Sequence, residues 1–241
     1  MLKSDMVKGE RPEGANRGAV DLQEWRPFKL VRKTLVSPNV YRFVLALPRP
    51  DDVLGLPAGQ HIALRAIIKG KAVARSYTPV SNNSDLGRIE LLVKVYDQSL
   101  MTKHLEKMEV GKTIDIRGPK RAMQYKPGKY AKHIGMIAGG TGITTMFQMN
   151  REICEDESDP TTLSLLYANN TEADMLLREE LDGYATQCPN KFCVHYILTK
   201  PSEGWTGSTV LSQQLSPSSI FQPRPTTLRC FCVGRRPWCR R

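Results

Sequence analysis

The sequence predicts two domains in succession, an antiparallel β-barrel followed by a parallel α/β domain. The chain has 241 residues, a length that suits two domains of modest size better than one large one. Short β-type runs separated by turn signals fill the first part, whereas strands alternate with helices in the second. The change of pattern places the boundary near residue 131, which gives expected domains at 26–131 and 132–209.

The first domain follows a polar leader. Residues 1–25 are rich in charge and glycine and lack apolar periodicity, so we predict a flexible segment there. One helix is expected at 101–109, where Gly111 stops it. Six short strands at this spacing indicate an antiparallel barrel or sandwich, and we expect them at 28–35, 40–47, 61–68, 72–80, 88–95 and 113–117.

The second domain begins with an apolar run and a glycine-rich turn. Alternation of strands and helices is typical of a parallel sheet with right-handed crossovers. We expect strands at 133–138, 162–167 and 192–198, with helices at 144–154 and 173–184.

Composition excludes several classes of protein. With 40% hydrophobic and 24% charged residues, the chain has the composition of an ordinary globular protein. It has no run of about 18 apolar residues and no signal-peptide core, so we expect a soluble, cytoplasmic chain without an integral membrane segment. Six cysteines without a CxxC pair or a His/Cys cluster indicate reduced thiols and no metal site.

The net charge of +11 is unevenly distributed. Residues 210–241 contain six arginines and no acid, so this short segment supplies more than half of the excess. A strongly basic chain raises the hypothesis of a nucleic-acid partner. Because the basic and aromatic residues interleave only in this terminal segment, we expect no nucleic-acid binding by the two domains.

The sharpest local motif is the glycine-rich turn Gly139-Gly140-Thr141-Gly142. It follows an apolar run and precedes a helix, where free backbone N–H groups and the helix dipole favour a phosphate. The motif is neither GxGxxG nor a P-loop. A tight strand-to-helix turn without a ligand is an equally good interpretation of these four residues alone.

A second motif ends a predicted strand of the barrel, Arg75-Ser76-Tyr77-Thr78-Pro79-Val80-Ser81. Period-two alternation puts Arg75, Tyr77 and Pro79 on one side. An arginine there suits a phosphate, a tyrosine ring suits a planar group, and the Thr78 hydroxyl suits a ring nitrogen. Taken alone, the segment also fits a strand with an exposed arginine and a half-buried tyrosine.

Together, these motifs resemble the NADH-cytochrome b5 reductase family within the ferredoxin-reductase-like flavoproteins, with a pattern similar to fungal members. The RxYTPVS and GGTGIT patterns carry the resemblance, which extends over about 26–209. Further matches are Lys94-Val95-Tyr96, Met101-Thr102, Gly118-Pro119, Ile137 to Met146, Tyr167 to Asn170 and Asp174 to Arg178.

The resemblance implies FAD and NADH as cofactors and assigns roles to individual residues. Thr78 would lie at the flavin N5 region that receives hydride and is the expected catalytic residue. The resemblance places the FAD pyrophosphate against Arg75 and the isoalloxazine against Tyr77. The full set of expected cofactor-binding residues is Arg75, Ser76, Tyr77, Thr78, Leu92, Lys94, Ser99, Met101, Thr102, Gly139, Gly140, Thr141 and Thr144.

Four positions depart from the family pattern. Ser99 and Arg121 stand where the family usually has glycine, and Thr145 replaces the proline of GITPM. Thr199 lies where many members carry an aspartate thought to disfavour the NADPH phosphate, and Lys200 is adjacent. The choice between NADH and NADPH therefore stays open on the sequence.

Residues 210–241 do not continue the family pattern, which has Gly-Phe-Val-Thr followed by Leu-Cys-Gly-Pro-Pro-Pro-Met-Val. If the third base of each codon is joined to the first two of the next, the codons from Phe231 to Cys239 permit that second motif. The same frame after Thr209 permits the first. We infer an out-of-frame tail of sequencing, splicing or natural origin, and expect the α/β sheet to lack its last strand.

The resemblance implies electron transfer from NADH through flavin to cytochrome b5 or a similar acidic haem protein. The alternative is the flavin domain of a nitrate-reductase-type enzyme, and a remote one is a basic RNA-binding protein. Lys126, Lys129 and Lys132 suit a solvated loop or a basic rim that steers an acidic cytochrome to the flavin. Membrane attachment at the endoplasmic reticulum or mitochondrial outer membrane would require an anchor upstream of Met1.

Overall fold

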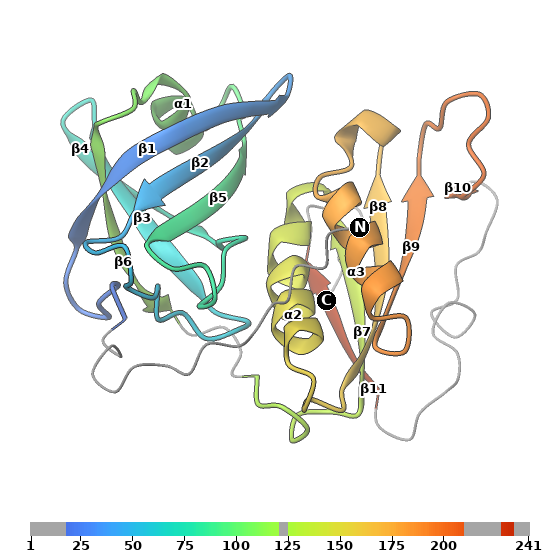
Figure 1. Ribbon diagram of the computed structural model, residues 1–241. Coiled ribbons are helices and arrows are strands. Elements are labelled where there is room, and N and C mark those ends of the chain that lie inside the picture. Colours follow the sequence, from blue (N-terminus) through green and yellow to red (C-terminus); the bar gives the residue numbers. More distant parts are fainter. Residues whose placement is uncertain (1–17, 121–124, 210–227, 234–241) are drawn as a thin grey trace, which may run out of the picture.

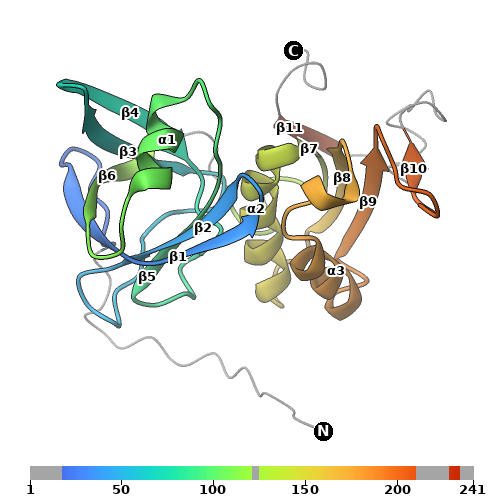
Figure 2. The same ribbon diagram turned by 90° about the horizontal axis from the view of Figure 1, so that it is seen from above.

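The first domain is a six-stranded antiparallel sheet that curls into a barrel, as predicted (Figures 1 and 2). The computed structural model describes residues 18–120 and 125–209 and the backbone of 228–233. The strand order is β4-β3-β6-β1-β2-β5, so β4 and β5 are the two edges. The strands are β1 (Arg26–Ser37), β2 (Val40–Ala46), β3 (His61–Ile68), β4 (Lys71–Tyr77), β5 (Arg88–Lys94) and β6 (Thr113–Lys120).

Alternation of apolar residues closes the barrel around its own core. On β3, Ile62 and Leu64 are fully buried, and they meet Leu30, Phe43 and Ile116 from neighbouring strands. Strand residues two apart point to the same side, so each strand contributes one face to this core. Helix α1 (Leu100–Lys107) packs against β3 and β4 and adds Met101 and Leu105 to the same cluster.

The predicted flexible leader is wrong for its last eight residues. Ala19 and Val20 are buried, and the Ala19 N–H donates to the Val53 carbonyl at 3.0 Å. Gly18 lies so close to Gly55 that a side chain on either would collide with the other's backbone. Two small apolar residues and a glycine therefore dock this segment on the barrel, a signal too short to show as periodicity. Residues 1–17 lie outside the described residues.

The second domain is a parallel sheet flanked by helices, also as predicted (Figure 1). Its strand order is β10-β9-β8-β7-β11, with helix α2 packed on β7 and β8 and helix α3 packed on β9. The elements are β7 (His133–Gly139), α2 (Ile143–Glu155), β8 (Thr162–Asn169), α3 (Arg178–Gln187), β9 (Phe192–Leu198), β10 (Ser208–Thr209) and β11 (Leu228–Val233). None of the helices in the described part of the chain is long and apolar enough to cross a membrane.

The predicted helix at 173–184 is divided in two. A 3-10 turn, η2 (Glu172–Asp174), comes first, and α3 begins only at Arg178. Thr171 and Asp174 form a reciprocal capping box that closes the short turn. Leu177 then adopts φ +59°, a left-handed conformation that no continuous helix allows.

The expectation that the sheet lacks its last strand is wrong. Strand β11, which lies within the suspected tail 210–241, pairs in parallel with β7 from Leu228 opposite His133 to Val233 opposite Ala138. The run Leu-Arg-Cys-Phe-Cys-Val has residue types that suit a strand, and the free edge of β7 accepts it. The out-of-frame origin of the tail is a separate hypothesis and stays a prediction.

Candidate nucleotide and flavin site

The Arg75–Ser81 segment crosses the open side of the barrel. It leaves edge strand β4 and reaches the opposite edge β5, where the Val80 N–H donates to the Glu90 carbonyl at 2.9 Å. The Glu90 N–H in turn donates to the Ser81 hydroxyl at 2.9 Å. The segment therefore bridges the two outermost strands of the sheet, a position where a ligand can lie across both.

The first three side chains of this segment differ in their exposure to solvent. Arg75 and Ser76 are exposed, and the Arg75 Nη1 donates to the adjacent Ala74 carbonyl at 2.8 Å. The register pairs Arg75 with Leu64 and Tyr77 with Ile62, which puts the two on one face as predicted. Tyr77 is half-buried against the barrel core, and burial raises the pKa of its hydroxyl to about 12. The ring is therefore neutral at physiological pH and presents a flat surface.

Helix α1 supplies the neighbouring polar groups, with one difference from expectation. Ser99 is the N-cap of α1, and its hydroxyl accepts from the Thr102 N–H at 3.3 Å. The Thr102 hydroxyl accepts from the Tyr96 N–H at 3.2 Å, so it closes the turn before the helix rather than pointing freely to a ligand. Met101 and Thr102 are buried. The departure from glycine at Ser99 thus has a local structural role, because a serine is a better helix cap than glycine.

The glycine-rich loop lies at the carboxyl end of β7. Gly139 is the last residue of the strand, Gly140–Gly142 form a 3-10 turn, and α2 follows directly. Strand order runs from β7 to β8 and β9 on one side and to β11 on the other. This is a topological switch point, where open α/β sheets bind their ligands. Gly140 has φ +52°, and the space beside its Cα is open.

Hydroxyl groups hold this loop in place. Thr144 donates to the Thr141 carbonyl at 3.2 Å, which fixes the entry into α2. Tyr167, fully buried on β8, donates to the Gly140 carbonyl at 3.2 Å and accepts from the Leu176 N–H at 3.1 Å. Tyr167 belongs to a motif that is recognisable in the sequence, but this role is not evident from the motif. A buried tyrosine at a strand end beside a glycine loop was the available signal, because a buried tyrosine hydroxyl needs a partner.

Asn169 is a further residue that the sequence analysis does not assign. It ends β8 beside the glycine loop and is 7% exposed. Within the described residues, neither its Oδ1 nor its Nδ2 makes a hydrogen bond of normal geometry, although the carboxamide lies near enough to the Tyr167 hydroxyl to oppose the rise in the pKa of that group on burial. A buried amide without partners is costly, so this carboxamide fits a site that takes a polar ligand.

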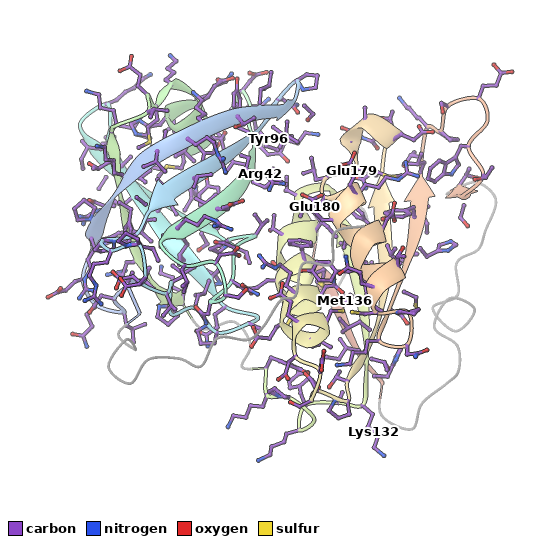
Figure 3. All side chains as sticks on the ribbon, in the orientation of Figure 1. Arg42, Tyr96, Lys132, Met136, Glu179 and Glu180 are labelled. Atoms are coloured by element: carbon purple, nitrogen blue, oxygen red, sulfur yellow. The ribbon has the colours of Figure 1, made fainter. Side chains whose placement is uncertain are left out.

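The two motifs meet across the domain boundary. The hydroxyl groups of Thr78 and Thr145 lie 3.2 Å apart, within hydrogen-bond distance. Lys94 on β5 pairs with Asp174 of η2 at 3.2 Å, and Leu92 belongs to the apolar cluster that includes the start of α2. The flavin-type segment and the glycine loop are therefore brought together, although they are far apart in the sequence (Figure 3 shows the facing elements).

Of the two interpretations of Lys126, Lys129 and Lys132, a solvated loop or a basic rim at the flavin, the rim does not fit their position. Lys126, Lys129 and Lys132 are exposed, but Lys132 directly precedes the amino end of β7. Figure 3 places it at the opposite end of that strand from the glycine loop, and a seven-residue strand is about 23 Å long. The solvated-loop interpretation is the better one, because the sequence alone could not tell at which end of the strand these lysines lie.

The remaining departures from the family pattern have local partners or fall outside the description. The Thr199 N–H donates to the Asn169 carbonyl at 3.0 Å, so Thr199 ties β9 to β8. Arg121 lies outside the described residues.

The comparisons with known proteins agree with this architecture. Residues 27–125 match the family model of an oxidoreductase FAD-binding domain, and residues 136–236 match that of an oxidoreductase NAD-binding domain. The structure of the cytochrome b5 reductase domain of Ulva prolifera nitrate reductase superposes with a TM-score of 0.83 at 31% identity, covering 92% of this chain and 91% of that one. The chain is thus a flavoprotein oxidoreductase with one domain for each of two cofactors.

Curated relatives identify the family. The chain is 43% identical over 230 residues to NADH-cytochrome b5 reductase 1 of Dictyostelium discoideum, covering 95% of this chain and 80% of the relative. It is 50% identical over 186 residues to NADH-cytochrome b5 reductase 1 of Debaryomyces hansenii, covering 76% of this chain and 64% of the relative. The chain belongs to the NADH-cytochrome b5 reductase family, and the NAD-binding match extends into the suspected tail.

Proposed function

We propose that this protein takes electrons from NADH onto a bound FAD and passes them to cytochrome b5 or a similar acidic haem protein. The 3.2 Å approach of the Thr78 and Thr145 hydroxyls carries the proposal. It joins the segment suited to a flavin directly to the helix that follows the glycine loop. A donor and an acceptor held on these two segments would meet without an intervening element of the protein.

The barrel residues fit FAD. Arg75 is exposed at the open edge, and no carboxylate among the described residues neutralises its guanidinium. Such a group can hold a diphosphate through two hydrogen bonds. Ser76 lies beside it, and Tyr77 offers a neutral ring face to a planar group. Ser99, Met101 and Thr102 would support the same ligand by fixing the start of α1, the helix that packs on β4.

The glycine loop fits a nicotinamide dinucleotide. Backbone N–H groups at a helix N-terminus favour a diphosphate, and the open space beside Gly140 admits close approach. Thr141 and Thr144 would keep the loop in shape, and the buried carboxamide of Asn169 would complete its hydrogen bonds on the ligand. Lys94, on the barrel side of the same opening, is paired with Asp174 and would offer its remaining N–H donors to the ligand.

Within this site the protein's side chains hold the two cofactors in position and do not themselves take part in the redox chemistry. When bound, the two cofactors supply the hydride and single-electron chemistry. Thr78 orients the end of the flavin segment through Thr145, and Leu92 and the apolar residues around it keep water out of the domain boundary. Pre-positioning of this kind accounts for much of the rate of a two-substrate step, because reacting atoms need an approach of about 3 to 3.5 Å.

The test is anaerobic mixing of the FAD-loaded chain with NADH. We expect loss of the oxidised-flavin absorption, followed by its return when oxidised cytochrome b5 is added and is itself reduced. A protein that stays colourless after incubation with FAD, or a flavin that dithionite reduces and NADH does not, would contradict the proposal. The same assay with NADPH measures the coenzyme preference.

A second candidate is the flavin domain of a nitrate-reductase-type enzyme, favoured by the similarity to the Ulva prolifera domain. It would share the first half-reaction and differ in the acceptor. Reduction of cytochrome b5 alone, compared with nitrate reduction in the presence of a molybdenum-containing partner domain, separates the two. The remote RNA-binding alternative rests on arginines of the tail, and a filter-binding assay with that segment deleted tests it.

A further inference from the structure

A second set of contacts joins the domains at the end of the Arg75–Ser81 segment. It consists of two charged residues on α2 and a loop of the barrel, and we call it the Arg151 cluster: Arg151, Glu155, Asn82, Ser84, Asp85 and the Val80 carbonyl. The Arg151 Nη1 donates to Asp85 at 2.5 Å and to the Val80 carbonyl at 3.2 Å. Its Nε donates to Glu155 at 2.7 Å.

Glu155 receives donors from three elements. Asn82 and Ser84 of the barrel loop donate to its Oε2 at 2.7 and 3.1 Å. Tyr184 of α3 donates to its Oε1 at 2.6 Å. The carboxylate is therefore the point at which the barrel, α2 and α3 converge.

The charges of the Arg151 cluster are largely withdrawn from water. Side-chain exposure is 15% for Arg151 and 13% for Asp85. Burial alone would lower the pKa of Arg151, but the hydrogen bonds and charges of Glu155 and Asp85 outweigh it and raise that pKa. Burial would likewise raise the pKa of Glu155, and donors from Tyr184, Asn82 and Arg151 lower it instead. Arg151 and Glu155 thus stabilise each other's charged form, and Asp85 also pairs with Arg88 at 2.6 Å on the barrel side.

Stability alone does not account for this arrangement. Glu155 is the last residue of α2, where the helix dipole disfavours a negative charge. Buried ion pairs often contribute no more to stability than apolar side chains of the same size. What they do provide is a fixed geometry, because an arginine fork accepts few alternative orientations.

The position of the Arg151 cluster indicates what that geometry fixes. Val80 belongs to the Arg75–Ser81 segment, whose Thr78 lies at the domain boundary. Arg151 lies six residues, or about 9 Å, along α2 from Thr145. Arg151 therefore holds the end of the flavin segment and the helix of the glycine loop by one side chain. A third contact, from the Gly59 N–H to Gln148 at 2.8 Å, adds to the same boundary.

We propose that Arg151 is a positioning residue that sets the spacing between the flavin segment, Arg75–Ser81, and the glycine loop, Gly139–Gly142. The inference rests on the proposed function, since it concerns hydride transfer between these two segments. Arg151 touches neither expected cofactor site directly. Its effect is on the rate of hydride transfer, with little effect on FAD binding.

The test compares FAD-loaded Arg151→Lys and Asp85→Asn variants with the wild-type chain. Arg151→Lys keeps the positive charge but loses the planar guanidinium with its several N–H donors. Asp85→Asn weakens the contact between Arg151 and the barrel loop. Stopped-flow reduction by saturating NADH and by NADH deuterated at the transferred position gives the hydride-transfer rate and its isotope effect. We expect a fall of about 10- to 100-fold in that rate, as a misplacement of about 1 Å can cause, with an increased isotope effect and unchanged FAD content.

A matched control is Arg65→Lys. Arg65 also binds a carboxylate through two nitrogens, Nε at 3.2 Å and Nη2 at 2.7 Å to Asp115, but both residues belong to the barrel. We expect this variant to reduce its flavin at the wild-type rate. Equal rates in Arg151→Lys, Asp85→Asn and wild type would overturn the proposal.

Hydrogen exchange separates failure of this inference from failure of the proposed function. We expect faster amide exchange at residues 80–87 and 143–155 in the two variants, with unchanged exchange in the barrel strands. A wild-type flavin that NADH does not reduce would contradict the proposed function, and the exchange pattern would then decide on the Arg151 cluster alone. Unchanged exchange in both variants would show that the Arg151 cluster does not hold the domains in place.

Discussion

The flavin segment and the glycine loop face each other but work by different means. Arg75–Ser81 lies at a barrel edge, and we expect it to recognise its cofactor through the side chains of Arg75, Ser76 and Tyr77. The Gly139–Gly142 loop lies at the carboxyl end of β7, and we expect it to recognise its cofactor through backbone N–H groups, which the hydroxyls of Thr144 and Tyr167 hold in position. We therefore expect cofactor binding at the Arg75–Ser81 segment to be sensitive to side-chain truncation. Binding at the glycine loop should instead be sensitive to changes in backbone conformation.

This difference also separates what each domain contributes to the reaction. The barrel side is a fixed surface, since Ser81 and Glu90 tie the segment to β5. The loop side depends on the sheet beneath it, because β8 and β11 flank β7. Changes in the second domain should therefore alter NADH reactivity without altering FAD content.

The largest expected effect comes from restoring the shifted reading frame after Thr209. The codons of that frame permit the family's Cys-Gly-Pro motif, which the resemblance places beside the nicotinamide. We expect the restored chain to reduce its flavin with NADH at least about 100-fold faster, since orientation controls such steps, while FAD content changes little. Sequencing the transcript around codon 209 and measuring both chains side by side provides the check. Equal turnover would show that residues 210–241 are functional and that the frameshift hypothesis is wrong.

Arg75→Ala should have the next largest effect, on the barrel side only. It removes a charged donor, which is worth about 1.5 to 3 kcal/mol, and should weaken FAD binding by roughly 10- to 150-fold. Quenching of FAD fluorescence on titration of the apoprotein measures the dissociation constant. Lys71→Ala, an exposed cation on the same strand β4, is the control and should bind FAD as wild type does. A wild-type affinity for Arg75→Ala would remove Arg75 from the site.

Gly140→Ala should weaken NAD⁺ binding at the glycine loop, by less than Arg75→Ala weakens FAD binding. Gly140 has φ +52° with open space around its Cα, so a methyl group meets no atom but strains the backbone by about 1 to 2 kcal/mol. Gly70, at φ +75° in the β3–β4 turn with equally open space, provides a matched control. Both alanine variants should lose similar stability in urea unfolding, and only Gly140→Ala should bind NAD⁺ more weakly in calorimetry. Equal NAD⁺ affinity in the two variants would show that the loop backbone is not the binding element.

Much of this arrangement could be predicted from the sequence because local signals were strong. The strands 61–68 and 192–198 have the predicted bounds, since turn residues enclose clear apolar runs. The docking of Ala19 and Val20, the partners of Thr102, and the Arg151 cluster could not be predicted. Each depends on which residues distant in sequence become neighbours, and periodicity carries no information about that. The site residues themselves were named through the resemblance to the family.

The smallest expected effect tests whether the two sites are independent. The Thr78 and Thr145 hydroxyls lie 3.2 Å apart across the domain boundary, and Thr145 is a departure from the family's proline. Valine has nearly the same shape as threonine, so Thr78→Val, Thr145→Val and the double variant form a cycle that removes little except the hydrogen bond.

We expect a coupling free energy of about 0.5 to 1.5 kcal/mol, the usual net contribution of one hydrogen bond. Urea unfolding of the FAD-loaded protein, followed by the release of flavin fluorescence, measures it. A coupling of zero would mean that the hydroxyls do not bind each other in solution. The flavin segment would then be held against the nucleotide domain by the Arg151 cluster and the apolar boundary around Leu92 rather than at Thr78.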